Sequence, residues 1–264
     1  MYYDMHVHSN FSSDSELDME KGILRAIELG LSGIAFTDHL DIDYVDHEAE
    51  YQYDFNEYFR KIGALKDKYA DQIEILTAVE IGLQPHVIEQ TKKRLDGLSF
   101  DYTIGSTHLV KRRDPYYGTY FKEGVSKKEA YDEYLQELYA NLKSYHHFST
   151  MGHLDYIVRY AHFSDSRFYY TDHSDLVDEI FKFIIAENIS FEINTSTYAK
   201  QPLDRNLLLR YKELGGEIVT IGSDAHGADR IADNFSVYLS ILKECGFPYV
   251  FHYKNMLPQP EKIN

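Results

Sequence analysis

Histidines and carboxylates recur at the ends of short β-prone runs along the whole sequence. Those that could bind a metal ion are His6, His8, His39, Glu80, His108, His153, Asp224 and His226. In an α/β barrel, functional side chains lie at the carboxyl ends of the strands. Hydrophobic packing does not require ionisable residues at such positions in six separate segments. The pattern therefore predicts a metal site assembled from segments far apart in the chain.

The spacing within two of these segments favours chelation. Side chains alternate along a strand, so His6 and His8 point to the same face and can bind one ion. Asp224 and His226 repeat this arrangement near the other end of the chain. Imidazole and carboxylate together suit zinc, iron or manganese better than calcium or magnesium. Each residue alone has an ordinary structural explanation, but the set as a whole favours metal binding.

The remaining histidines lie in predicted helices, loops or the tail, and we expect them to be surface or structural residues. They are His47, His86, His146, His147, His162, His173 and His252.

The elements that position these residues alternate along the chain, as in a parallel sheet built from strand–helix units. The predicted strands are Tyr2–His8, Gly33–Asp38, Ile73–Gly82, Tyr102–His108, Phe148–His153, Ser190–Asn194 and Ile218–Asp224. The predicted helices are Met19–Leu29, Tyr53–Tyr69, His86–Leu95, Lys127–Ser144, Ser174–Ala186, Asp204–Leu214 and Asp229–Cys245. No glycine-rich nucleotide loop follows the first strand, which favours a closed or distorted barrel over an open doubly wound sheet. No linker interrupts the pattern, so we expect one domain over residues 1–264.

Composition limits the partners. The chain has 264 residues, with 27 basic against 43 acidic side chains and a formal charge of −16. Such a field repels polyanions, so nucleic acid is not expected as a partner. No apolar run approaches the ~20 residues of a membrane-spanning helix, and the first residues do not form a signal peptide. With a single cysteine, these features predict a soluble cytoplasmic protein that does not bind membranes.

As an ordered set, the motifs resemble those of the polymerase and histidinol phosphatase (PHP) superfamily over most of the chain. The matching segments are His6-x-His8, Asp14, Thr37-Asp38-His39, Glu80, Gly105-Ser106-Thr107-His108, Gly152-His153-Leu154-Asp155, Glu192-Ile193-Asn194-Thr195 and Gly222-Ser223-Asp224-Ala225-His226. Within the superfamily, the sequence is most similar to the bacterial monofunctional L-histidinol-phosphate phosphatases.

The resemblance implies a distorted (β/α)7 barrel that holds three divalent transition-metal ions. The first ion would be bound by His6, His8, Glu80 and Asp224. The second would share Glu80 and take His108 and His153, and the third would be bound by Asp14, His39 and His226. A bridging water with a pKa lowered toward ~7 would supply hydroxide for attack on phosphorus, and Asp224 could help to move protons.

Phosphate recognition is expected to involve Arg159, which could form a bidentate contact with the phosphate. The family tends to carry a second basic residue soon after the Glu192–Thr195 segment. Here Lys200 or Arg205 could take that place. The organic end of the substrate would contact the acidic and tyrosine-bearing loops at Asp41–Glu50 and Tyr116-Tyr117.

The sequence thus predicts a histidinol-phosphatase of histidine biosynthesis. Alternatives within the superfamily are a nuclease or phosphodiesterase, which the negative charge disfavours, and a protein-tyrosine phosphatase. A non-enzymatic metal-binding module is a further alternative, which the completeness of the ligand set disfavours.

Overall fold

We describe the chain from a computed structural model, which covers residues 2–45, 51–199 and 202–264. Its parallel strands are β1 (Tyr3–Val7), β2 (Gly33–Phe36), β3 (His39–Asp41), β4 (Glu74–Gly82), β5 (Tyr102–Ser106), β6 (Thr150–Met151), β7 (Ser190–Asn194) and β8 (Val219–Gly222). An antiparallel hairpin follows, formed by β9 (Tyr249–Lys254) and β10 (Leu257–Lys262). The α-helices are α1 (Met19–Glu28), α2 (Phe55–Tyr69), α3 (Ile88–Leu95), α4 (Lys127–Ser144), α5 (Ser174–Ala186), α6 (Arg205–Glu213) and α7 (Phe235–Glu244).

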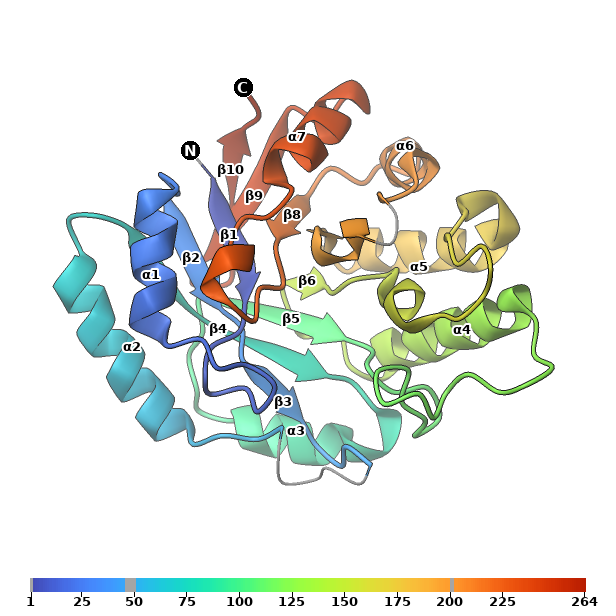
Figure 1. The fold of residues 1–264 in the computed structure, drawn as a ribbon, viewed down its shortest axis with the longest axis horizontal. Coiled ribbons are helices and arrows are strands. Elements are labelled where there is room, and N and C mark those ends of the chain that lie inside the picture. Colours follow the sequence, from blue (N-terminus) through green and yellow to red (C-terminus); the bar gives the residue numbers. More distant parts are fainter. Residues whose placement is uncertain (1, 46–50, 200–201) are drawn as a thin grey trace.

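The parallel strands form a nearly closed barrel. They pair in the order β1-β2-β4-β5-β6-β7-β8, and the helices lie around the outside of the sheet (Figure 1). The two ends of this sheet meet, because the backbone N–H of His8 donates to the carbonyl of Ala225 at 2.9 Å. A Cβ atom at Gly222 would lie 2.4 Å from that of His6, so only glycine permits this close approach. The expected α/β barrel architecture is confirmed.

The helices cover the sheet because their apolar residues recur at helical spacing. In α5, Val177, Ile180, Phe181 and Ile184 are all buried, which gives one continuous apolar face. A second, smaller core fills the barrel interior. It consists of Tyr3, Met5, Ala35, Leu76, Ala78, Tyr102, Ile104 and Tyr253.

The barrel is distorted where its second strand breaks. β2 pairs with residues 74–77 of β4, and β3 resumes the pairing at Glu80–Gly82. The intervening Asp38 is fully buried, and its carboxylate accepts hydrogen bonds from Ser9 and Ser12. This break places His39 at the start of β3, beside Glu80 in the register.

Four elements differ from those predicted, and the first is β3, which no predicted strand covers. β6 is only two residues long, although the apolar pattern predicted a strand over Phe148–His153. The predicted last helix begins later, at Phe235, because a short 3₁₀ turn at Ala228–Arg230 and further turns precede it. The hairpin β9–β10 was not predicted, since prolines at 258 and 260 weaken its strand signal.

The hairpin closes the amino-terminal end of the barrel. The hydroxyl of Tyr253 lies 3.1 Å from the carbonyl of Ser149 and 3.2 Å from the hydroxyl of Ser190, where β6 and β7 begin. The opposite end, where the strands terminate, stays open for a site.

Among the described residues, no helix has both the length and the apolar character needed to cross a membrane. The cytoplasmic location expected from the sequence stays a prediction.

Candidate active site

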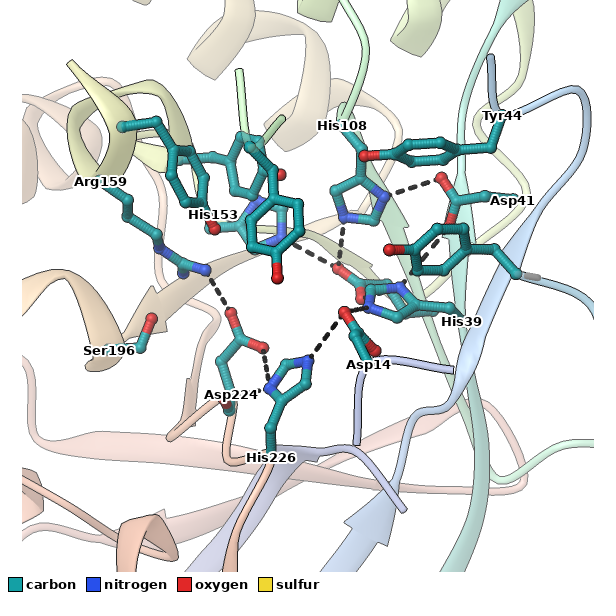
Figure 2. Close-up of a pocket in the computed structure, with 15 residues that line it drawn as sticks. Asp14, His39, Asp41, Tyr44, His108, His153, Arg159, Ser196, Asp224 and His226 are labelled. Atoms are coloured by element: carbon teal, nitrogen blue, oxygen red, sulfur yellow. Dashed lines mark hydrogen bonds and ion pairs between the residues drawn. The ribbon is translucent and has the colours of Figure 1, made fainter. Parts of the chain in front are cut away.

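A pocket of about 350 Å³ opens at the carboxyl ends of the strands (Figure 2). Its lining consists of Asp14, His39, Asp41, Tyr44, Tyr51, Glu80, His108, Tyr116, His153, Tyr156, Arg159, Tyr160, Ser196, Asp224 and His226. Seven of the nine predicted metal ligands are in this lining. His6 and His8 lie beneath it, fully buried and in contact with Glu80 and Asp224.

Glu80 lies at the centre of the ligand set. Its Oε2 atom is 3.4 Å from Nε2 of His6, 3.4 Å from Nε2 of His8 and 3.0 Å from Nδ1 of His39. Its Oε1 atom is 2.9 Å from Nε2 of His153 and 3.2 Å from Nε2 of His108. One buried carboxylate therefore faces five imidazoles, with its two oxygens directed to different groups.

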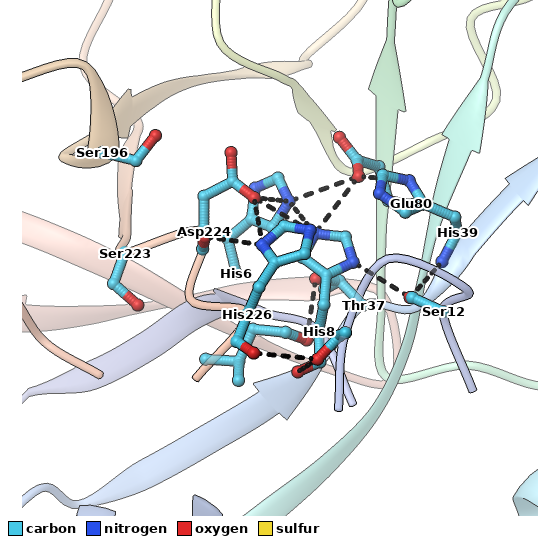
Figure 3. Close-up of polar contacts among 12 residues, drawn as sticks. His6, His8, Ser12, Thr37, His39, Glu80, Ser196, Ser223, Asp224 and His226 are labelled. Atoms are coloured by element: carbon cyan, nitrogen blue, oxygen red, sulfur yellow. Dashed lines mark hydrogen bonds and ion pairs between the residues drawn. The ribbon is translucent and has the colours of Figure 1, made fainter. Parts of the chain in front are cut away.

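A second group forms around His8 (Figure 3). The His8 ring stacks on those of His39 and His226, each with a centroid distance of 4.2 Å. Asp14 Oδ2 lies 3.5 Å from Nε2 of His39 and 3.4 Å from Nε2 of His226. His39 thus faces Asp14 through one ring nitrogen and Glu80 through the other.

Three sets of residues could each hold a metal ion, because the donor atoms within each set lie within 4.8 Å of one another. They are His8-His39-His226, His6-His8-Glu80 and His39-Glu80-His108. The sets share members, as expected for neighbouring ions with bridging ligands.

The hydrogen bonds of His6 and His8 fit a cation between them. His6 donates from Nδ1 to Glu192 at 2.5 Å. His8 donates from Nδ1 to Ser12, whose hydroxyl donates to Asp38. Both Nε2 atoms are then left as acceptors, yet they lie 3.0 Å apart. Two facing lone pairs need a shared proton or a metal ion, and imidazole nitrogens are common zinc ligands.

Buried polar atoms that form no hydrogen bond also indicate a bound cation. Within the part of the chain that the structure describes, Nδ1 of His39 and Oε2 of Glu80 are buried and lie 3.0 Å apart, but neither forms a hydrogen bond. Buried polar atoms are normally hydrogen-bonded, so such pairs require an explanation. A bound cation would satisfy both atoms, and the donor set therefore fits a metal.

The electrostatics leave His8 and Glu80 in the protonation states that bind metal ions. Burial, reinforced by the nearby His39 and His226, lowers the pKa of His8 to about 3, which leaves the ring neutral. Burial favours the neutral form of Glu80. The surrounding imidazoles of His6, His108 and His39 outweigh it and hold the pKa of this carboxyl well below its ordinary value. Neutral imidazole and ionised carboxylate are the metal-binding forms.

Asp224 connects the metal ligands to Arg159. Its backbone is left-handed, with φ of 52°, a strained conformation that clusters at functional sites. Oδ1 lies 3.2 Å from Nε2 of His8, and Oδ2 accepts a hydrogen bond from Arg159 at 2.6 Å. Arg159 also donates to Asn194 at 2.9 Å and to Thr197 at 3.2 Å. The guanidinium is thus held at the pocket wall beside the ligand set.

Two carboxylates contact histidines of the predicted ligand set, and sequence reasoning assigned neither of them this place. Glu192 accepts from His6 and also from the backbone N–H of His153 at 2.6 Å. Asp41 accepts from Nδ1 of His108 at 2.8 Å. Such partners orient metal-binding histidines. Glu192 is part of the Glu192–Thr195 motif. Its role could have been predicted in the same way as that of Glu80, because both are acidic residues within an apolar strand.

The other residues predicted to bind the substrate do not all lie at the pocket. Arg205 is not brought to the pocket: it begins α6, and its guanidinium pairs with Glu244 of α7 at 2.6 Å. Lys200 and residues 46–50 lie outside the described residues. Tyr116 lines the pocket, whereas Tyr117 is absent from its lining and places its hydroxyl 3.3 Å from that of Tyr51.

The seven remaining histidines do not join the site as far as the structure describes them. None of His86, His146, His147, His162, His173 and His252 lines the pocket, and His47 lies outside the described residues. His173 and His252 are buried structural residues, paired with Asp132 and stacked on Tyr3, respectively.

Comparisons with known proteins agree with this geometry. The family model described as "PHP domain" matches residues 4–196. A probable histidinol-phosphatase of Clostridium acetobutylicum is 37% identical over 97% of this chain and 99% of the relative. The histidinol-phosphatase of Lactococcus lactis is 30% identical over 92% of this chain and 91% of its own. The crystal structure of the Lactococcus lactis histidinol phosphate phosphatase, complexed with zinc, L-histidinol and phosphate, superposes with a TM-score of 0.92 at 29% identity and covers 98% of each chain. The chain belongs to the PHP domain family, in the group that contains these histidinol-phosphatases.

Proposed function

We propose that the chain is a phosphomonoesterase that hydrolyses L-histidinol phosphate to L-histidinol and phosphate, a step of histidine biosynthesis. One observation carries the proposal: the similarity to the histidinol-phosphatases extends over nearly the whole of both chains. The convergence of nine ligand residues beside an arginine supports it. The zinc, L-histidinol and phosphate bound to the Lactococcus lactis protein suggest the metal and both reaction products.

The residues present support binding of up to three divalent ions, with zinc favoured by the comparison. His6, His8, Glu80 and Asp224 would hold one ion, and Glu80, His108 and His153 a second. Asp14, His39 and His226 would hold the third. When bound, such ions supply positive charge for a phosphate and lower the pKa of a water so that it can attack.

The charge of the site is consistent with a phosphate substrate. Three divalent ions would exceed the charge of the three ligand carboxylates, so the pocket would be positive although the chain carries −16. A local excess of this kind can attract a phosphate dianion into an acidic protein.

The chain's own residues have two further tasks. Arg159 would turn its guanidinium from Asp224 toward the phosphate and form charge-assisted hydrogen bonds with it. Asp224 is ionised, because His6 and Arg159 hold its pKa well below its ordinary value despite burial. Its carboxylate can accept the proton of the attacking water and return it to the leaving alcohol oxygen.

A substrate panel tests the proposal. The metal-loaded protein is assayed on L-histidinol phosphate, p-nitrophenyl phosphate, a phosphotyrosine peptide and bis-p-nitrophenyl phosphate, with elemental analysis of the same preparation. We expect kcat/KM to be highest for L-histidinol phosphate and the diester to be nearly inert. A preference for the peptide or the diester would instead support a tyrosine phosphatase or a phosphodiesterase. Equal kcat/KM for L-histidinol phosphate and p-nitrophenyl phosphate would leave only a general phosphatase.

A further inference from the structure

Two chain segments form the tyrosine-bearing rim of the pocket. One follows β3 and carries Tyr44 (Figure 2). The other spans residues 110–120 and carries Tyr116. Both tyrosines line the pocket above the ligand set. The relative placement of the two segments therefore sets the shape of this part of the wall.

Inside the rim, the two segments are joined through Asp114. The hydroxyl of Tyr44 hydrogen-bonds the Asp114 carboxylate. The same carboxylate accepts from the backbone N–H of Tyr116 at 2.6 Å and of Tyr117 at 3.3 Å. Any shift of the first segment is thus passed to the backbone that carries Tyr116.

Outside the rim, an ion pair joins the segments a second time. The Arg112 guanidinium donates from both terminal nitrogens to the two carboxylate oxygens of Asp43. Nε2 of His86 lies 2.6 Å from the same carboxylate. Neither Asp43 nor Arg112 lines the pocket, so neither is placed to contact a substrate there.

The backbone on both sides of this pair is strained. Asp43 has φ of 58°, and Lys111 and Arg112 have φ of 50° and 61°. Lys111 and Arg112 form a two-residue turn closed by paired hydrogen bonds between Val110 and Arg113. Such turns favour Asn-Gly, because both central residues need positive φ. A lysine and an arginine persist in this conformation only where other contacts hold them.

Those contacts come from both sides of the turn. Lys111 and Arg113 pair with Glu133 of α4 at 3.1 Å and 2.6 Å, while Arg112 reaches across to Asp43. The turn is therefore anchored to a helix on one side and to the Tyr44 segment on the other.

We propose that the Asp43–Arg112 ion pair is a positioning element that sets the places of Tyr44 and Tyr116 and thereby the fit of the substrate's organic end. The inference rests on the proposed function, in which the phosphate lies at the metal ligands and the organic group faces the tyrosines. Asp43 and Arg112, which lie outside the pocket, would thus influence which substrate binds without taking part in hydrolysis.

The test compares Asp43→Asn, Arg112→Gln and the double variant with the wild type. Asparagine keeps the size of Asp43 and tolerates positive φ. Each single variant should raise KM for L-histidinol phosphate by about three- to fivefold at unchanged kcat, as expected for loss of one surface ion pair at the upper end of its usual strength. KM for p-nitrophenyl phosphate should change by less than about twofold. The double variant should be no worse than either single one, because the two residues act as one unit.

Two control variants separate the pair from its surroundings. Arg25→Gln removes another surface arginine, which pairs with Glu28 at 2.7 Å on α1, and should leave both KM values unchanged. Lys111→Gly relieves strain in the turn and keeps the Asp43–Arg112 pair. It removes the contact of Lys111 with Glu133, but Arg113 still pairs with Glu133, so this variant should also behave as wild type. If Lys111→Gly raised KM as Arg112→Gln does, the turn and not the ion pair would be responsible.

Amide hydrogen exchange supplies a readout that needs no substrate. Loss of the pair should accelerate exchange at residues 114–120, while exchange in α1 should stay unchanged. Equal KM values and equal exchange in wild type and Arg112→Gln would overturn the inference, even if L-histidinol phosphate is the substrate. Absence of L-histidinol phosphate hydrolysis in the wild type would overturn the proposed function and the substrate role of the ion pair. Accelerated exchange alone would then show only a structural link.

Discussion

Glu80 illustrates how one residue can organise a site. It lies near the carboxyl end of the apolar strand β4, where it lines the pocket, and it contacts five imidazoles from four separate segments. Ser106 adds a hydrogen bond to Oε1 at 2.6 Å. A carboxylate in this position can bridge two ions, whereas a histidine such as His39 would bind one.

The first prediction concerns this residue. Glu80→Gln should lower kcat/KM by at least about 100-fold and reduce the bound metal, because a neutral amide cannot bridge two cations. His39→Ala should cost less. Elemental analysis and kinetics on the same preparations measure both effects.

Cys245→Ala is the control, since Cys245 is buried at the end of α7 and absent from the pocket lining. Its turnover should match that of the wild type. Full metal content and turnover in Glu80→Gln would contradict the bridging role.

The second prediction concerns Arg159. Its side chain is 15% exposed and borders the ligand set, so Arg159→Ala should remove a charge-assisted contact to phosphate. We expect kcat/KM to fall by roughly ten- to a hundredfold, and by a similar factor for every phosphomonoester.

Arg167→Ala is matched to it, because Arg167 is exposed and pairs with its near neighbour Asp165 at 2.9 Å. This variant should keep wild-type kinetics. A loss confined to L-histidinol phosphate in Arg159→Ala would show that Arg159 reads the organic end of the substrate instead.

At the scale of elements, local signals determined the long helices. The observed α4 and α5 have the predicted bounds. α4 begins with a capping box in which Ser126 accepts from the backbone N–H of Glu129 while the Glu129 side chain accepts from Ser126. The sequence predicts short elements less well. β6 has only two residues and depends on its pairing with β5 and β7.

The third prediction tests this capping box. Ser126→Ala should lower the free energy of unfolding by about 1 kcal/mol, because the backbone N–H of Glu129 at the start of α4 loses its partner. Ser144→Ala changes the same residue type at the other end of the helix, where its hydroxyl only donates to the carbonyl of Asn141. It should cost less than about 0.5 kcal/mol. Denaturant unfolding of the two variants measures the difference, and equal losses would argue against the cap.

At the scale of the whole molecule, metal binding and pH are linked. Burial disfavours a charged His108, but the carboxylates of Asp41 and Glu80 outweigh it and raise its pKa to about 10 in the metal-free chain. The ring is therefore protonated at neutral pH until a metal displaces the proton. In the metal-free chain, this ion pairing stabilises the fold fully below pH ~6.5 and is lost as the pH rises through about 10.

The fourth prediction follows from this linkage. Zinc binding at pH 7 should release protons, and zinc affinity should increase with pH up to about 10. Calorimetric titrations in two buffers of different ionisation enthalpy measure the protons released. The metal should also raise Tm, and the gap between loaded and chelated protein should widen from pH 7 to pH 9. A zinc affinity independent of pH would contradict the protonation of His108.

The sequence by itself determined the alternation of strands and helices and which residues are candidates to bind metal ions. These depend on local periodicity and on residue types at strand ends, such as His6 and His8. The tertiary structure decided which side chains meet across the barrel. Glu192 and Asp41 support the histidines, and Arg205 lies apart with Glu244, because barrel closure and strand register set these contacts. The C-terminal hairpin likewise depends on the barrel end that it covers, which no local pattern in residues 249–262 encodes.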